Sequence, residues 1–271
     1  MGFEHATPGV LLLALILVLP VLYYIGVARR TKNLYVRRIP GVDAVDEAVG
    51  RSAELGKPIC FSTGLSQIGP VLYASLGVLF HIARKAARYK NRLLVPQVAP
   101  DVMAIVEDTI SEAYRREGRI SQLDPNAVMY LSDEQFAFAA GYAGLVQREK
   151  IASAFLFGSF AAESLILAEA GQQVGAMQVA ASVSPEQVAF FICTCDYTLI
   201  GEELFAASSY LTKEPVQLGT LYAQDRAKLL FFTMILIGVG IATLSSVCGR
   251  ELANFDWVFS LGWDVLGGWI K

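Results

Sequence analysis

The stretch that decides the fold is PICFSTGLSQIGPVLYASLGVLFHIA, residues 58–83. A short apolar run at 59–62 is typical of a buried strand, and a loop with two glycines follows at 63–69. Residues 68–83 are then apolar enough to form a helix buried in a domain. A strand, a loop and a helix in this order predict an α/β unit, in which the helix leads to a parallel strand.

The same alternation continues along the chain on both sides of this stretch. Residues 39–212 alternate short apolar runs with helical patterns, which predicts a mostly parallel sheet of about six strands with helices on both faces. A helix before the first strand is indicated by the helical spacing of Val42, Val45 and Val49. The strands expected after the first are 93–98, 127–131, 154–157, 175–180 and, as the sixth, 189–194.

The composition indicates membrane segments and argues against nucleic acid as a partner. Of the 271 residues, 54% are hydrophobic and 17% are charged, against about 45–50% and about 25% in a typical soluble domain. The net charge of −3 argues against nucleic acid as a general partner, because neutralising phosphates takes a basic surface. The four cysteines do not show the spacing of a disulfide scaffold, so we expect reduced thiols.

Two uncharged segments, 6–28 and 229–249, are each long enough to cross a bilayer, which takes about 20 residues. A cleaved signal peptide does not fit the first segment, because no basic residue precedes it and Arg29 and Arg30 follow it. The sequence therefore predicts an N-terminal transmembrane helix within 1–28, an α/β domain with linkers at 29–228, and a second transmembrane helix at 229–249.

The orientation follows from the basic residues beside the two predicted spans, because cytoplasmic flanks carry an excess of lysine and arginine. Most of these residues lie between the spans: Arg29, Arg30, Lys32, Arg37, Arg38, Arg226 and Lys228. Outside the spans, toward the two termini, the chain has only Arg250 and Lys271. We therefore expect an inner (plasma) membrane protein with the domain in the cytoplasm and both termini outside.

Two segments leave alternatives open. Residues 68–83 are a little short for a span, and a buried helix is the favoured interpretation; a third span would place the termini on opposite sides. The tail at 250–271 contains Trp257, Trp263 and Trp269 and fits a segment lying in the outer interface, or one that binds a partner.

The first candidate binding site is the loop after the first strand. Glycines allow close approach of the backbone, and the following helix N-terminus presents N–H groups to an anion. The loop is neither a nucleotide P-loop nor a GxGxxG motif, and an ordinary strand–helix turn is the simpler interpretation. Ligands do bind beyond the carboxyl ends of strands in open α/β sheets. The weak candidates for ligand binding here are Ser62, Thr63, Gly64, Ser66 and Gly69.

The second candidate follows the expected sixth strand, at the same sheet edge as the loop, and consists of Asp196, Tyr197, Glu202 and Glu203. Acids and a tyrosine at a strand end suit acid–base chemistry or a hard cation. The alternative is that acids simply favour the first turn of a helix. Glu163 and Glu169 lie in a largely apolar helix. A carboxylate buried there would need a partner and would mark a site or a subunit contact, but a solvent-facing stripe is the simpler interpretation.

The chain has few residues of the kinds that usually form catalytic or metal centres. The only histidines are His5 and His81, and His81 lies on an apolar helix, where a core histidine is the favoured interpretation. Cys193 and Cys195 stand without a further cysteine or histidine nearby to complete a tetrahedral metal site. We therefore predict no catalytic residue, no metal ligand and no cofactor, and the sequence leans against an enzyme.

Two longer motifs carry a resemblance to a known family. They are RRIPGVDAVDEAVGR at 37–51 and CDYTLIGEELFAASSYL at 195–211. With LLVPQ at 93–97 and SDEQFAFAAG at 132–141, the chain resembles an uncharacterised family of bacterial two-span membrane proteins with a cytoplasmic α/β domain. The resemblance implies this layout and no activity, cofactor or catalytic residue.

These patterns predict a membrane-anchored α/β scaffold or assembly subunit that forms homo-oligomers or docks onto a larger membrane complex. Apolar residues abound even where a helix should have a polar face, as at 153–170, and exposed apolar area usually means an interface. The alternative is a ligand-binding or enzymatic domain that takes a small anionic, nucleotide-like molecule at the loop 62–69.

Overall fold

The computed structural model describes residues 8–30, 40–212 and 215–248. The chain divides into two compact units, one made of residues 1–34 and 215–271 and the other of residues 35–214. The predicted tail at 250–271 lies outside the described residues, as do Lys32, Arg37 and Arg38.

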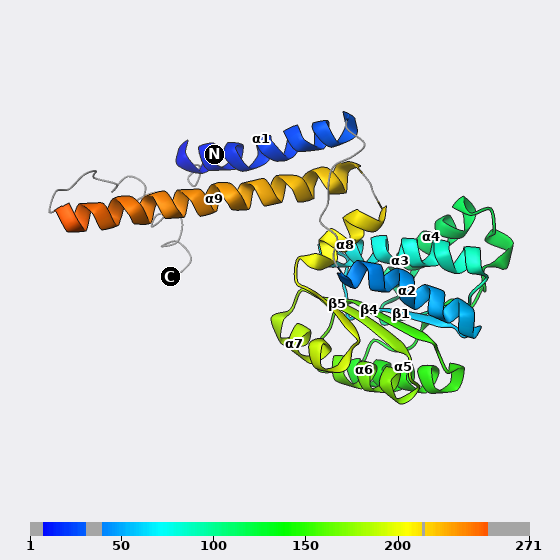
Figure 1. The fold of residues 1–271 in the computed structure, drawn as a ribbon. Helices are drawn as coiled ribbons and strands as arrows, with labels where there is room; N and C mark the ends of the chain where they lie inside the picture. The colour runs from blue at the N-terminus through cyan, green and yellow to red at the C-terminus, as the bar shows by residue number, and fades with distance from the viewer. Residues whose placement is uncertain (1–7, 31–39, 213–214, 249–271) are drawn as a thin grey trace, which may run out of the picture. The chain divides into compact units, whose positions relative to one another are not determined.

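The unit at 35–214 is built on a sheet of six parallel strands in the order β3-β2-β1-β4-β5-β6. This confirms the predicted α/β fold and its parallel sheet. Figure 1 shows the neighbouring strands β1, β4 and β5 at the centre of this unit. The strands are β1 (Ile59–Gly64), β2 (Leu93–Gln97), β3 (Val128–Tyr130), β4 (Ser153–Ser159), β5 (Met177–Ser182) and β6 (Tyr197–Ile200).

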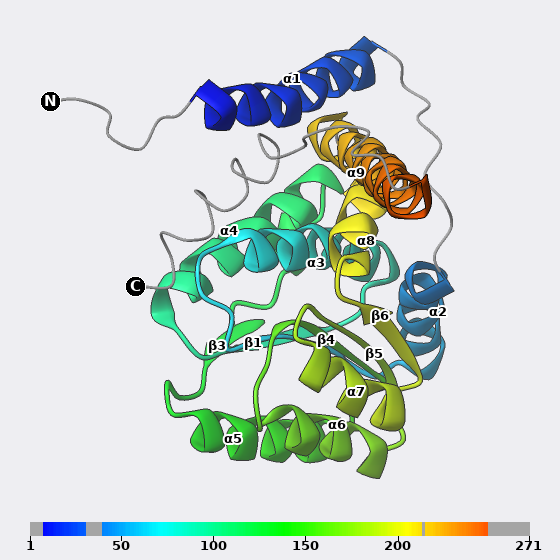
Figure 2. The same ribbon diagram turned by 90° about the vertical axis from the view of Figure 1, so that its left-hand side faces the viewer.

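Helices cover both faces of this sheet, as Figure 2 shows. One face carries α2 (Pro40–Leu55), α3 (Pro70–Tyr89), α4 (Pro100–Arg116) and α8 (Glu203–Thr212). The other face carries α5 (Gln135–Glu149), α6 (Ser164–Gln173) and α7 (Pro185–Thr194). A short 3-10 turn, η1 (Ile120–Gln122), lies between α4 and β3.

The core is double because the central strands are buried on both faces. Successive strand residues point to opposite faces, so Phe61 and Phe157 pack on the side of α3, whereas Cys60 and Leu156 pack on the side of α5. The rings of Phe61 and Phe157 stack with centroids 5.9 Å apart across the junction of β1 and β4. The stretch 68–83 lies mostly in α3, where Leu79 and Ile82 are fully buried, and therefore forms a buried helix of the domain.

The sixth strand is not where the sequence placed it. Residues 189–194 belong to α7, and β6 comprises 197–200 instead. Ser184 is extended and Pro185 occupies the first turn of α7, an arrangement that starts a helix. The apolar run that follows is too short to distinguish a helix from a strand by its periodicity.

The other unit contains two long helices that pack against each other, α1 (Pro8–Arg30) and α9 (Pro215–Cys248). The rings of Tyr24 and Tyr222 meet edge to face with centroids 5.3 Å apart. A Cβ atom added to Gly219 would lie 2.7 Å from the Cα atom of Ile25, so glycine allows the two backbones to approach closely. Over the described residues, no helix combines the length and the apolar character that a membrane crossing requires.

Candidate functional site

The strand order places the loop after β1 at the point where the winding of the sheet reverses. β1 and β4 are neighbours, and the helices that follow them, α3 and α6, cover opposite faces. In doubly wound sheets of this order, ligands bind in the crevice at this switch point, beyond the carboxyl ends of the strands. The loop 62–69 therefore occupies the position at which Rossmann-like folds bind their ligands.

The side chains at the end of β1 are turned inward. Ser62 and Thr63 are buried, and the Thr63 hydroxyl donates to Oε1 of Gln97 at 2.9 Å. The backbone N–H of Gly64 donates to Oγ of Ser62 at 3.1 Å. The first bond joins β1 to β2, and the second lies within the end of β1. Neither side chain at 62–63 is open to solvent.

Ser66 and its neighbours close the loop onto the end of β4. The Ser66 hydroxyl donates to the carbonyl of Thr63 at 2.5 Å and accepts the N–H of Ser159 at 2.8 Å. The N–H of Leu65 donates to the carbonyl of Ser159 at 2.8 Å. An anion-binding loop presents free N–H groups to its ligand. Here the amides of 64–66 are all bonded within the chain.

The four residues of the second candidate do not gather at the loop. Asp196 and Tyr197 stand at the beginning of β6, at the edge of the sheet opposite to the loop, because all strands are parallel. The expectation that these two share the loop's edge is wrong, because the sixth strand lies later in the chain than predicted. Asp196 instead accepts the N–H of Gln178 at 2.7 Å and fastens the start of β6 to β5.

Glu202 and Glu203 do follow the carboxyl end of β6. They are separated from β1 by β4 and β5, which is three strand spacings or roughly 14 Å. Glu203 accepts the N–H of Ile200 at 2.9 Å, as an acid at a helix start does. Within the ranges that the structure describes, no group of three or more His, Cys, Asp or Glu could hold a metal ion.

A polar cluster that the sequence did not reveal connects the starts of three helices at the loop's edge of the sheet. Glu163 is fully buried rather than solvent-facing; its carboxylate accepts the N–H of Ala161 at 3.0 Å and the amide of Gln135 at 2.6 Å. The Ser164 hydroxyl donates to Gln187 at 2.5 Å. The cluster thus fastens α5, α6 and α7 together. No spacing in the sequence indicates it, because its members come from separate connections.

Large apolar side chains are exposed at this same edge of the sheet, by which we mean the side where the strands have their carboxyl ends. They come from four of the segments that lead from a strand into the next helix: Ile68, Tyr73, Tyr130, Phe136, Leu165 and Ile200. Phe136 is 61% exposed and Tyr73 is 57% exposed. We call this surface the apolar edge.

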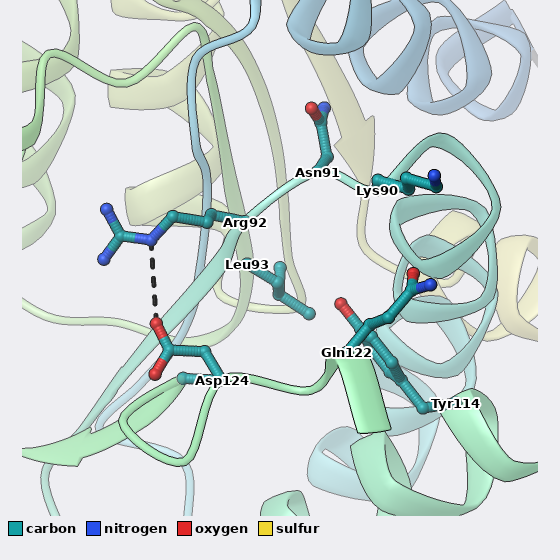
Figure 3. Close-up of a pocket in the computed structure, with 8 residues that line it drawn as sticks. Lys90, Asn91, Arg92, Leu93, Tyr114, Gln122 and Asp124 are labelled. Carbon is teal, nitrogen blue, oxygen red and sulfur yellow. Dashed lines mark ion pairs between the residues drawn. The ribbon is translucent and has the colours of Figure 1, made fainter. Parts of the chain in front are cut away.

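Two hollows lie at the opposite edge, where the strands begin. Figure 3 shows the first, of about 220 Å³, in which Arg92 turns toward Asp124, with Nε and Oδ2 3.6 Å apart, while Tyr114 and Gln122 lie on the other side of Leu93. The second, of about 400 Å³, is lined by Lys57, Gln147, Lys150, Gln173 and Val174.

A family model described as a domain of unknown function, DUF6754, matches residues 2–253. The chain belongs to this family. The match covers both units and confirms the resemblance to an uncharacterised family. No curated protein and no solved structure matches the chain.

His81 of the DUF6754 chain lies beside an ion pair between α2 and α3, formed by Asp46 and Lys85. Its Nε2 atom lies 2.8 Å from Oδ1 of Asp46, and Nζ of Lys85 lies 2.7 Å from the same oxygen. Partial burial acts to raise the pKa of Asp46, but the hydrogen bonds from His81 and Lys85 outweigh it and lower the pKa from 3.8 to about 2. The side chain of Asp46 is 45% exposed, which weakens the interaction through solvent screening.

We expect Asp46→Asn to lower the free energy of unfolding of the DUF6754 chain by about 1 kcal/mol at neutral pH. Because the pKa of Asp46 is lower in the folded state, the ionised carboxylate stabilises the fold at pH values above the unfolded pKa of 3.8. This contribution is lost as the pH falls through the folded pKa of about 2. Urea unfolding at several pH values should therefore show a difference that disappears between pH 4 and pH 2. Glu47→Gln, an exposed neighbour on α2, is the control; an equal loss there would contradict the assignment.

Cysteine reactivity should follow burial. Burial raises the pKa of Cys60 to about 12 and that of Cys195 to about 12, whereas Cys193 is exposed. Because the thiolate is the reactive form, we expect iodoacetamide at pH 8 to modify Cys193 before Cys60 and Cys195. Peptide mass spectrometry over time measures this, and modification of Cys60 in the folded DUF6754 chain at a similar rate would contradict the structure.

Proposed function

We propose that this chain is a membrane-anchored α/β scaffold or assembly subunit, which self-associates or docks onto a larger membrane complex. The observation that carries the proposal is the apolar edge. Large exposed apolar side chains grouped on one surface usually mark an interface. They lie where a Rossmann-like fold normally receives a ligand, so this domain would use that edge to bind a protein surface.

The closed loop after β1 supports assembly rather than ligand binding. The amides of 64–66 are bonded to groups of the chain, and Ser66 occupies the space between the ends of β1 and β4. A ligand would have to break these bonds before it could use them. A protein partner needs only the side chains that project from the edge.

The helices α1 and α9 are proposed as the anchor. Every residue from Leu229 to Gly240 in α9 is exposed, and none is charged. Moving each such large side chain out of water is worth about 1.5–3 kcal/mol, so lipid would stabilise this surface strongly. The uncharged segments of the sequence, 6–28 and 229–249, extend beyond the described residues. The proposed location is the inner membrane, with the α/β unit in the cytoplasm and both termini outside.

Thiol labelling in membrane vesicles tests the anchor and its orientation. In a Cys248→Ser variant, we expect a membrane-impermeant maleimide to reach Cys193 in inside-out vesicles and not in right-side-out vesicles. Extraction of the protein by carbonate, or labelling in right-side-out vesicles, would contradict the proposal.

Self-association has its own measurement. Native mass spectrometry of the detergent-extracted chain should show more than one copy, alone or within a larger assembly. A strictly monomeric particle without partners would contradict a scaffold.

A second candidate function rests on one observation, the position of the loop 62–69 at the switch point of the sheet. A small anionic, nucleotide-like molecule would bind there after the loop opens. A thermal-shift screen with nucleotides tests it, because a ligand that binds the folded state raises the unfolding temperature. An unchanged unfolding temperature at millimolar nucleotide would exclude this candidate.

A further inference from the structure

The two edges of the sheet carry opposite charge. The connections that follow the strands contain no lysine or arginine, and the chain has neither between Lys150 and Lys213. The acids in these connections and in the first turns of the helices that follow are Asp101, Asp133, Glu134, Glu163, Glu186, Glu202 and Glu203, of which Glu163 is buried. The apolar edge is therefore also acidic.

The opposite edge has five exposed basic residues, and we call it the basic edge: Lys57, Lys90, Arg92, Arg148 and Lys150. Asp124 and Glu149, which pair with Arg92, and Asp196 lie at the same edge. Lys57, Lys90 and Lys150 lie shortly before the first residues of β1, β2 and β4. None of the three makes an ion pair with another described residue. Three lysine ammonium groups on this edge are thus available to a partner.

Segregated charge alone would carry little weight, since helix dipoles favour acids at helix starts and bases at helix ends. The second observation is that the basic edge is hollowed. The two hollows of the basic edge, of about 220 Å³ and about 400 Å³, are lined by Lys90 and Arg92 and by Lys57 and Lys150. On the apolar edge Phe136 is 61% exposed beside the exposed Asp133 and Glu134. One edge has exposed apolar and acidic groups, and the other has basic hollows.

We propose that the apolar edge of one copy of this chain docks onto the basic edge of a second copy. The exposed ring of Phe136 enters the hollow of about 400 Å³, and Glu134 and Asp133 pair with Lys57 and Lys150, which line it. This inference rests on the proposed self-association and names its two surfaces. A head-to-tail contact of this kind generates rings or filaments.

A mixing experiment with two variants tests the contact. Phe136→Asp removes the apolar edge and leaves the basic edge intact. Lys57→Glu with Lys150→Glu removes the basic edge and leaves the apolar edge intact. These side chains are exposed, so both variants should fold, and circular dichroism checks this. Glu107→Lys, exposed on α4, is the matched control for a change of charge.

We expect the wild type and the Glu107→Lys control to form oligomers in native mass spectrometry, and each edge variant alone to be monomeric. Equal amounts of the two edge variants should form one-to-one dimers, because each retains one working edge. Oligomers that persist in either variant alone would overturn the head-to-tail contact while leaving self-association intact. A monomeric wild type would overturn the proposed self-association, and this inference with it.

Discussion

Gly64→Ala lowers the free energy of unfolding of the α/β unit by about 3 kcal/mol or more. Gly64 ends β1 with a φ of +60°, a conformation that costs a residue with a Cβ atom about 1 kcal/mol. The added Cβ would also collide with the backbone carbonyl of Ser159 and with the ring of Phe160, 2.6 Å away. Neither group can retreat, because the Ser159 carbonyl accepts a hydrogen bond from Leu65 and Phe160 packs in the core.

Gly56→Ala is the matched control for this variant. Gly56 has a φ of +62°, and no atom lies within 4 Å of its added Cβ. The Gly56 variant should therefore lose only about 1 kcal/mol of unfolding free energy, the cost of the left-handed backbone conformation. Urea unfolding followed by circular dichroism measures both variants. Equal losses would show that the ends of β1 and β4 are not packed as closely as the structure places them.

Gly219→Ala separates α1 from α9. The added Cβ would lie 2.7 Å from Cα of Ile25 and 3.0 Å from the carbonyl oxygen of Tyr24, and both atoms belong to a helix backbone. Since a helix backbone cannot yield locally, the two helices must move apart along their contact. Small residues at such positions allow close helix packing, most of all in membranes.

Cross-linking measures this separation. With Tyr24→Cys and Tyr222→Cys in the same chain, a short bifunctional maleimide should link the two helices efficiently, and Gly219→Ala should reduce the yield several-fold. Gly238→Ala in α9, which has no atom within 4 Å of the added Cβ, should leave the yield unchanged. An undiminished yield in the Gly219 variant would contradict the close contact.

The alternation of apolar runs and helical patterns was sufficient to predict the α/β class, the parallel sheet and most of its strands. It misplaced the sixth strand, because the apolar run around Phe190 and Phe191 is compatible with both helix and strand over so few residues. That error moved Asp196 and Tyr197 to the wrong edge of the sheet. The local sequence of this run is compatible with either structure, and only the packing of the folded chain makes it a helix.

The sequence by itself determined the class of fold, the place of the glycine loop after the first strand and the scarcity of groups for catalysis. All three depend on residue type and local spacing. The tertiary structure alone decided that the loop is closed onto β4, that Glu163 is buried, and that apolar and basic side chains occupy opposite edges of the sheet. Those features join residues from connections far apart in the chain. Only the order and the parallel direction of the strands bring such residues together.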